Sequence, residues 1–198
     1  MISKVYSAAL SGIESFRVTI EVDSFPTLEP SLQLVGLPDT AVREAKDRIK
    51  SACFNSGYSW PDASFTINLA PADRRKEGSA FDVPLLLGIL RCGGTVMQGV
   101  TFEGRCFTGE LSLTGEVRPV HGVLSMCADA KRDGFREFYA PAENAREAAA
   151  VEGITVYAVH HIRDIVDHLN GKKAMTPVVP DIPQKPVVIS GDLDGDNK

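Results

Sequence analysis

Five consecutive charged residues, followed by a glycine, are the residues best placed for chemistry in this sequence. They are Asp73, Arg74, Arg75, Lys76 and Glu77, ahead of Gly78. Arg74, Arg75 and Lys76 are candidate contacts for an anion or for the phosphates of a nucleic acid, because the helix that follows adds a partial positive charge at its amino end. The alternative is that these cations form ion pairs across a subunit boundary or remain solvated, since the neighbouring carboxylates dilute their charge.

Histidines and cysteines do not have the spacing of a metal site. His161 and His168 share one helical face, but two turns separate them by about 10 Å, which is too far for one ion. We interpret them, with His121 and His160, as surface and cap histidines. The cysteines are Cys53, Cys92, Cys106 and Cys127. They are widely spaced in apolar segments without a CxxC pair, which favours small buried hydrophobic residues and predicts neither a metal site nor a disulfide.

A P-loop for nucleotide phosphates is absent from the sequence. The only GK pair, Gly171-Lys172, is preceded at the required position by Val166 and followed by Lys173. A P-loop needs closely spaced backbone N–H groups that wrap the phosphates, and this segment lacks the glycine that allows it. We therefore expect no cofactor in this chain.

The elements next to the charged run are a strand and a buried helix. Residues 65–69 alternate apolar and polar, which predicts a strand with one buried face that ends at Pro71. The apolar stretch 83–91 predicts a short helix buried on most sides, with Asp82 as its N-cap. The charged run is then a loop between two core elements.

The remaining pattern predicts an α+β fold with a β-rich first half. Strands are expected at 2–9, 15–23, 31–35, 138–140 and 154–159, a strand pair within 105–120, and helices at 39–55, 122–132, 142–151 and 161–169. Asp39 is expected to cap the first of these helices. Beyond Gly134, strands and helices alternate, which indicates crossover units.

Beyond Asn170 the composition changes to that of a linker. Pro177, Pro180, Pro183 and Pro186 recur every third residue, along one side of a semi-rigid polyproline II segment. The end segment GDLDGDNK has some features of a calcium-binding loop, but its glycine falls too early and no downstream Glu is present. We therefore interpret it as a solvated acidic tail. We assign residues 1–170 to one domain and residues 171–198 to a linker and acidic tail, of which residues 174–198 are expected to bury nothing.

Composition is that of an ordinary globular protein, with 43% hydrophobic and 24% charged residues. The net charge of −5 argues against nucleic-acid binding over a broad face, but it leaves room for a local basic patch. No stretch approaches the roughly 18 apolar residues of a membrane helix, and the start lacks the apolar core of a signal peptide. These features predict a cytoplasmic protein without a membrane segment.

Three long segments resemble one protein family. They are VGLPDTAVREAKDRIKSA (35–52), INLAPADRRKEGSAFDVP (67–84) and FTGELSLTGEVRPVHGV (107–123). In order and without gaps, they resemble the amino-terminal domain of the magnesium-chelatase-like AAA+ ATPases of the ComM/YifB type, which is associated with DNA uptake. The resemblance covers roughly residues 1–170.

This resemblance implies a fold like the second domain of ribosomal protein S5, which the catalytic domain of Lon protease shares. It also implies a homo-oligomeric, hexameric ring that acts on DNA. ATP and magnesium would bind only in an ATPase module outside this chain. DNA is then the expected partner, bound weakly by this domain alone.

The likeness to Lon raises the question of a Ser-Lys dyad, in which a lysine takes the proton of a nucleophilic serine. The position that matches the serine holds Ala80, and the position that matches the lysine holds Met126. Ser79 is one residue away, which turns its side chain by about 100°, and Lys131 lies about 140° around the helix from Met126. We therefore expect no catalytic activity from this chain.

Three functions remain as hypotheses. The first is a non-catalytic accessory domain that supports ring assembly and contacts DNA during DNA uptake or recombination, as in natural transformation. The second is a Lon-like serine peptidase with a site rearranged around Ser79. The third is an adaptor of a metal-chelatase-type complex.

Overall fold

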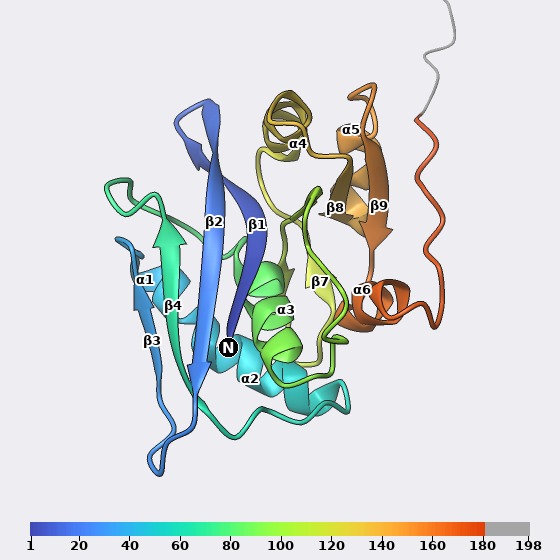
Figure 1. Ribbon diagram of the computed structural model, residues 1–198. Coiled ribbons are helices and arrows are strands. Elements are labelled where there is room, and N and C mark those ends of the chain that lie inside the picture. Colours follow the sequence, from blue (N-terminus) through green and yellow to red (C-terminus); the bar gives the residue numbers. More distant parts are fainter. Residues whose placement is uncertain (181–198) are drawn as a thin grey trace, which may run out of the picture.

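Helix α3 (Asp82–Cys92) lies between two sheets in the computed structural model, which describes residues 1–180 (Figure 1). The first sheet has the strand order β1-β2-β4-β3, antiparallel except for the last pair. Its strands are β1 (Ile2–Ser11), β2 (Glu14–Phe25), β3 (Leu32–Val35) and β4 (Ser64–Ala70). The strands predicted in this half of the chain are confirmed, each within a few residues of its predicted bounds.

Helix α3 fills the inner face of this sheet. Every residue from Asp82 to Leu90 is buried, which confirms the predicted core helix. The helix packs on β1, on β2 and on α2 (Ala45–Asn55). Gly88 permits the close approach, because a Cβ there would lie 2.6 Å from Cγ2 of Val22 on β2.

A short helix, α1 (Thr40–Arg43), precedes α2 and begins as predicted. The Asp39 carboxylate accepts a hydrogen bond from the Val42 amide at 2.8 Å, which is an N-cap. The chain breaks helical continuity at Glu44, and α2 then buries one face against the core. The buried residues of α2 are Ala45, Ile49, Ala52 and Cys53.

The second sheet is parallel, in the order β5-β8-β9. Its elements are β5 (Arg105–Phe107), α4 (Val123–Arg132), β8 (Glu137–Pro141), η1 (Ala142–Asn144), α5 (Ala145–Ala148), β9 (Thr155–Val159) and α6 (Ile162–Leu169). The expected alternation of strands and helices is confirmed, and with it the α+β class. The helix predicted over 142–151 is wrong in length. Asn144 accepts a hydrogen bond from the Val120 amide at 2.8 Å, and a 3-10 turn forms there before α5.

The strand pair predicted within 105–120 is confirmed only in part. Strand β6 (Glu110–Leu111) pairs with β7 (Val117–Arg118), whereas β5 joins the second sheet. The chain turns away at Gly109, whose N–H donates to the Ala80 carbonyl at 2.9 Å. A Cβ at Gly109 would lie 2.7 Å from Cγ1 of Val117, so only glycine fits this approach.

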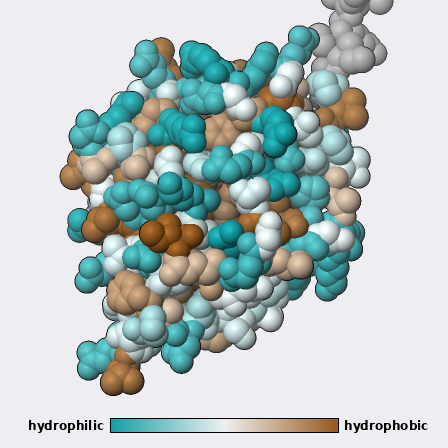
Figure 2. Space-filling model, viewed as in Figure 1, coloured by the Kyte–Doolittle hydropathy of each residue, from teal (hydrophilic) through white to brown (hydrophobic). Residues whose placement is uncertain are grey.

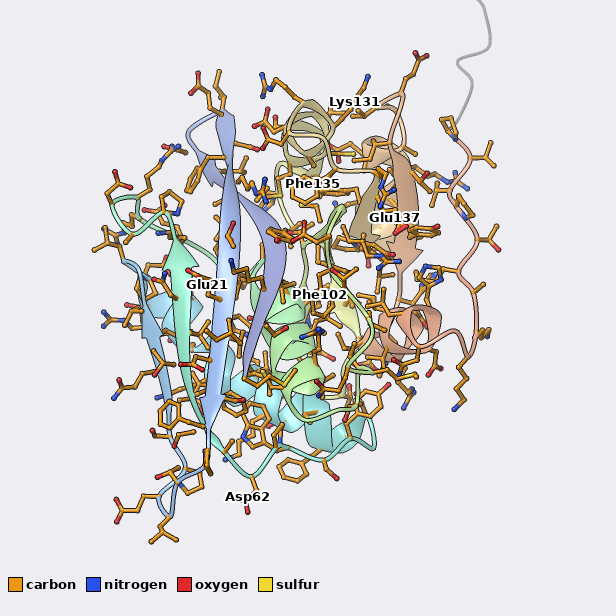
Figure 3. The ribbon with its side chains drawn as sticks, viewed as in Figure 1. Glu21, Asp62, Phe102, Lys131, Phe135 and Glu137 are labelled. Atoms are coloured by element: carbon orange, nitrogen blue, oxygen red, sulfur yellow. The ribbon has the colours of Figure 1, made fainter. Side chains whose placement is uncertain are left out.

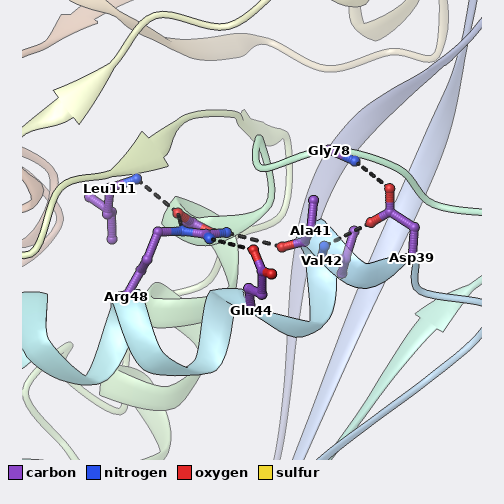
Figure 4. A network of polar contacts seen from close by, with 8 residues as sticks. Asp39, Ala41, Val42, Glu44, Arg48, Gly78 and Leu111 are labelled. Carbon is purple, nitrogen blue, oxygen red and sulfur yellow. Dashed lines mark hydrogen bonds and ion pairs between the residues drawn. The ribbon is translucent and has the colours of Figure 1, made fainter.

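Asp82 is not the N-cap of α3, and that prediction is wrong. Phe81 occupies the cap position, and Asp82 is the first helical residue. Its carboxylate is fully buried and accepts hydrogen bonds from Arg48 Nε at 2.7 Å, from Arg48 Nη2 at 3.0 Å and from the Leu111 amide at 3.0 Å (Figure 4). Burial raises the pKa of Asp82, and the bonds from Arg48 and Leu111 oppose that shift.

The segment after α6 runs alongside β9 (Figure 1). Val178 donates its amide to the Val156 carbonyl at 2.8 Å, and Met175 donates its amide to His168 Nδ1 at 2.9 Å. Met175 and Val178 are half-buried against the core. The expectation that residues 174–198 bury nothing is therefore wrong for Met175 and Val178. Pro183, Pro186 and the acidic end lie outside the described residues.

The surface carries mostly hydrophilic residues on the face seen in Figure 2, and the hydrophobic residues are interspersed among them. None of the helices within residues 1–180 has the length and apolarity that a membrane crossing requires.

We expect Arg48→Ala to lower the free energy of unfolding by about 3–5 kcal/mol, because it leaves the Asp82 carboxylate buried without its cation. Asp82→Ala should cost less, since the Arg48 side chain is 20% exposed and can turn toward water. Urea denaturation measures the free energy of unfolding of both variants.

Glu44→Ala is the matched control, because the Glu44 carboxylate lies 3.9 Å from the Arg48 guanidinium but its side chain is 62% exposed. We expect it to change the free energy of unfolding by no more than about 0.5 kcal/mol. A loss for Arg48→Ala no larger than that of the control would contradict this role.

Truncation tests the packing of the segment after α6. A chain that ends after Lys173 should be less stable than one that ends after Pro180 by about 1–3 kcal/mol, because half-buried Met175 and Val178 are lost. Thermal denaturation of the two truncated chains gives the difference directly. Equal melting temperatures would show that this segment contributes nothing to stability.

Candidate functional site

A pocket of about 540 Å³ lies where β1, the segment before α3 and the start of α4 meet. Gly78, Ser79 and Ala80 line it from one side, and His121 and Met126 from the other. Gly78 and the neighbouring Gly122 have φ angles of 87° and 78°, in the left-handed region that favours glycine. At Gly122 a Cβ would also lie 2.3 Å from Cδ1 of Leu10, so glycine lets α4 begin close to β1.

The two positions that the resemblance to Lon suggests for a Ser-Lys dyad line this pocket together. Ala80 and Met126 both line it, although the sequence separates them widely. Neither side chain can act as a nucleophile or as a base. Ser79 and His121 also line the pocket, but within residues 1–180 neither the Ser79 hydroxyl nor the His121 ring makes a hydrogen bond. Within the described residues, the lining of this pocket therefore shows no hydrogen-bonded pair of nucleophile and base.

Three carboxylates give the pocket an acidic lining. They belong to Asp39, Glu77 and Glu110. Asp39 is already engaged, because it accepts hydrogen bonds from the Val42 amide and from the Gly78 amide at 3.2 Å (Figure 4). Glu77 pairs with Arg75, Nε to Oε1, at 3.2 Å. These contacts hold the loop before α3 against α1.

Lys76 is buried, and the prediction that it contacts phosphates is wrong. Its side chain has no exposed surface. The ammonium donates to the Gly36 carbonyl at 2.7 Å and to the Pro71 carbonyl. Burial lowers the pKa of Lys76. The amine therefore connects the segment 36–39 to the charged loop 73–77, and it cannot reach a ligand at the surface.

The backbone around Lys76 supports the same connection. Its amide donates to the Leu37 carbonyl at 3.0 Å, and its carbonyl accepts from the Asp39 amide at 2.9 Å. Leu37 has a φ of 58°, which is uncommon for a residue with a side chain. Sequence reasoning missed this anchor because a lysine within a run of five charges has the pattern of a solvated residue. Its long aliphatic stem, which can lie along apolar surface, is the signal of burial that the sequence offers.

Arg74 and Arg75 remain exposed at the surface. Arg75 is paired with Glu77, but its side chain is 70% exposed. The Arg74 guanidinium lies 3.7 Å from the centroid of the Phe16 ring on β2, in a cation–π contact. Of the three cations predicted to contact an anion, Arg74 and Arg75 are therefore accessible to a ligand.

The start of α3 offers no free amides to an anion. The Asp82 amide donates to the Ser79 carbonyl, the Val83 amide to Gly109 and the Leu85 amide to Phe81. Pro84, which lies between Val83 and Leu85, has no N–H. The expected contribution of the helix end to anion binding is therefore wrong, because these donors are used within the protein.

One histidine has the capping role expected from the sequence, and His168 is half-buried against the ring of Tyr157. His161 caps α6 in a capping box with Asp164, and His168 accepts the Met175 amide. Cys53, Cys106 and Cys127 are buried, and Cys92 is half-buried. Burial raises the pKa of the Cys53 thiol to about 11. Among residues 1–180, no three His, Cys, Asp or Glu side chains gather into a group that could hold a metal ion.

Comparison with known proteins places this architecture in a family. Residues 20–144 match the family described as subunit ChlI of magnesium chelatase. The chain belongs to the ChlI family. Competence protein ComM of Haemophilus influenzae is 38% identical over 189 residues, which cover 94% of this chain and 36% of that protein. Uncharacterized protein YifB of Escherichia coli is 36% identical over 174 residues, which cover 88% of this chain and 34% of that protein.

The ChlI-family chain spans about a third of the length of these curated relatives. It also resembles the mitochondrial Lon protease homolog of Bos taurus, with 43% identity over 70 residues, 33% of this chain and 7% of that protein. The predicted family and its likeness to Lon are confirmed.

Lys76→Ala tests the anchor in this ChlI-family domain. We expect it to lower the free energy of unfolding by about 2–6 kcal/mol, because the Gly36 and Pro71 carbonyls lose their donor, at roughly 1–3 kcal/mol each. Arg75→Ala, one residue away but exposed, should change stability by no more than about 0.5 kcal/mol. Chemical denaturation of the two variants makes the comparison. Similar losses would mean that burial of the Lys76 amine is unimportant.

Proposed function

We propose that this chain is a domain without peptidase activity that lies at the amino end of a magnesium-chelatase-like AAA+ ATPase of the ComM/YifB type. It supports assembly of a homo-oligomeric ring and contacts DNA in DNA uptake or recombination. ATP and magnesium belong to a separate ATPase module, and the protein acts in the cytoplasm. Its fold is that of the second domain of ribosomal protein S5.

The observation that carries the proposal is the meeting of Ala80 and Met126 in one pocket. A serine nucleophile without its base loses orders of magnitude in rate, and here both positions are apolar. The pocket is then a scaffold feature, and function must come from surfaces. Similarity to competence protein ComM over 94% of this chain supports a role in handling DNA.

Arg74 and Arg75 are the proposed DNA contacts. Both are exposed, and they lie on the loop that leaves the end of β4. Guanidinium groups pair with phosphates in bidentate geometry, and such contacts are independent of base sequence. With a net charge of −5, the isolated chain should bind weakly and gain affinity from several copies in a ring.

A second candidate is a serine peptidase built on Ser79. It is favoured by one observation, that Ser79 and His121 line the same pocket. A fluorophosphonate probe tests it, with Ser79→Ala as the control. We expect no labelling above that of the control. Covalent labelling of Ser79 that disappears in Ser79→Ala would replace the non-catalytic assignment.

A salt titration of DNA binding tests the arginine contacts. Arg74→Ala/Arg75→Ala should weaken binding equally for unrelated sequences and flatten the slope of log affinity against log salt by about 1.4–1.8, at roughly 0.7–0.9 per contact. The matched control removes two other exposed arginines, Arg118→Ala/Arg163→Ala, with the same change in charge. Wild type and both variants are measured alone and fused to a hexamerising module. Equal slopes for the two double variants would leave assembly as the proposed role.

A further inference from the structure

A second pocket, of about 330 Å³, lies at the opposite end of the first sheet from Arg74 and Arg75. Residues of α2, of the loop before β4 and of the start of β3 line it, among them Lys46, Lys50 and Trp60. The loop before β4 lies at the lower end of the molecule, where Asp62 is labelled in Figure 3. The charged loop follows the other end of β4. Seven residues of strand separate the two sites by roughly 20 Å.

Two unpaired cations face this pocket. Lys46 and Lys50 are exposed, one turn apart on α2, and within residues 1–180 neither forms an ion pair. Like charges four residues apart destabilise a helix, so stability does not explain this pair. Asp47 also lines the pocket and reduces its local charge to a single net cation. The lining therefore attracts an anion moderately and in a salt-sensitive way.

Trp60 gives the pocket an aromatic wall. It is the only tryptophan in the sequence. Its ring packs edge-to-face on buried Phe65, with centroids 5.9 Å apart and an interplanar angle of 78°. Trp60 remains half-buried, and the Lys50 ammonium lies 5.8 Å from its ring centroid. The contact with Phe65 fixes the indole, while part of it stays open to the pocket.

We propose that this pocket binds one nucleotide unit of a single-stranded nucleic acid. The base stacks on Trp60, and the adjoining phosphates contact Lys46 and Lys50. Aromatic rings beside lysines hold unpaired bases in this way without reading sequence. The volume is at the lower end of the range for small-ligand pockets, which suits a single base. A base inside a duplex has both faces covered and cannot enter, so single strands are preferred over duplexes.

This proposal does not depend on the arginine contacts. Arg74 and Arg75 would meet phosphates of any nucleic acid, whereas the Trp60 pocket requires an unpaired base. The two sites lie on different elements, so substitutions can disrupt one and leave the other intact. The Trp60 pocket could therefore bind a base even if Arg74 and Arg75 contact no phosphate, and the reverse also holds.

Tryptophan fluorescence tests the site directly, because the single indole lies in it. Oligothymidylate should quench the emission of the full chain at low salt, and a duplex of equal length should leave it nearly unchanged. Lys46→Ala/Lys50→Ala should weaken oligothymidylate binding about tenfold or more at low salt. It should also reduce the salt slope by about 1.4, at roughly 0.7 for each contact with a single strand. Lys4→Ala/Lys172→Ala, which removes two exposed lysines elsewhere, is the matched control and should bind as wild type does.

Two further measurements complete the test. Binding of labelled oligothymidylate by Trp60→Phe should be weakened less than by Trp60→Ala, because phenylalanine retains an aromatic face. Arg74→Ala/Arg75→Ala should keep the fluorescence quenching. The proposal is overturned if quenching is absent, if duplex or polyglutamate quenches as strongly, or if Lys46→Ala/Lys50→Ala binds as the control does. Loss of quenching in Arg74→Ala/Arg75→Ala alone would assign all binding to the arginine site.

Discussion

The buried carboxylate of Asp82 is the interaction on which the arrangement of the core depends. It accepts hydrogen bonds from Arg48 on α2 and from the Leu111 amide on β6, and it belongs to the first turn of α3. Three elements from distant parts of the chain are therefore fixed around one charge. A buried carboxylate tolerates little displacement of its partners, because any lost bond leaves a charge without solvation. The start of α3, and with it one wall of the pocket that Ala80 and Met126 line, is held in one position.

A second buried charge does the same for the loops. The Lys76 ammonium joins the Gly36 and Pro71 carbonyls, and the Asp39 carboxylate joins the Gly78 amide. The segments 35–52, 67–84 and 107–123, which carry the family resemblance, thus meet one another through these polar contacts and through those of Asp82. Much of what makes the family recognisable in this sequence is a set of mutual anchors. Family membership then explains the scaffold better than it explains any chemistry.

The elements of this fold were largely predictable from sequence, whereas the partners of its charges were not. Alternation within β2 and the apolar stretch in α3 depend on local pattern, and both predictions are confirmed. Lys76 and Asp82 were misplaced because their burial depends on groups that other segments supply, such as Gly36 and Arg48. Met175 and Val178 were assigned to a solvated linker for the same reason, since their contacts are with α6 and β9. Ala80 and Met126 were identified as the dyad positions from the resemblance to Lon alone, and only the fold shows that both line one pocket.

The charge distribution limits where this domain can meet a polyanion. A net charge of −5 means that binding needs places where cations are locally in excess. Arg74 stacks on Phe16, which covers one face of the guanidinium while its edge can still donate hydrogen bonds. Lys46 and Lys50 stand beside Trp60, where a base can contribute stacking energy that does not depend on charge. In both places an aromatic ring accompanies the cation, so the proposed contacts with a nucleic acid would not rely on long-range attraction alone. An acidic domain of this kind would discriminate by local geometry, and its binding would become useful where several copies act on the same strand.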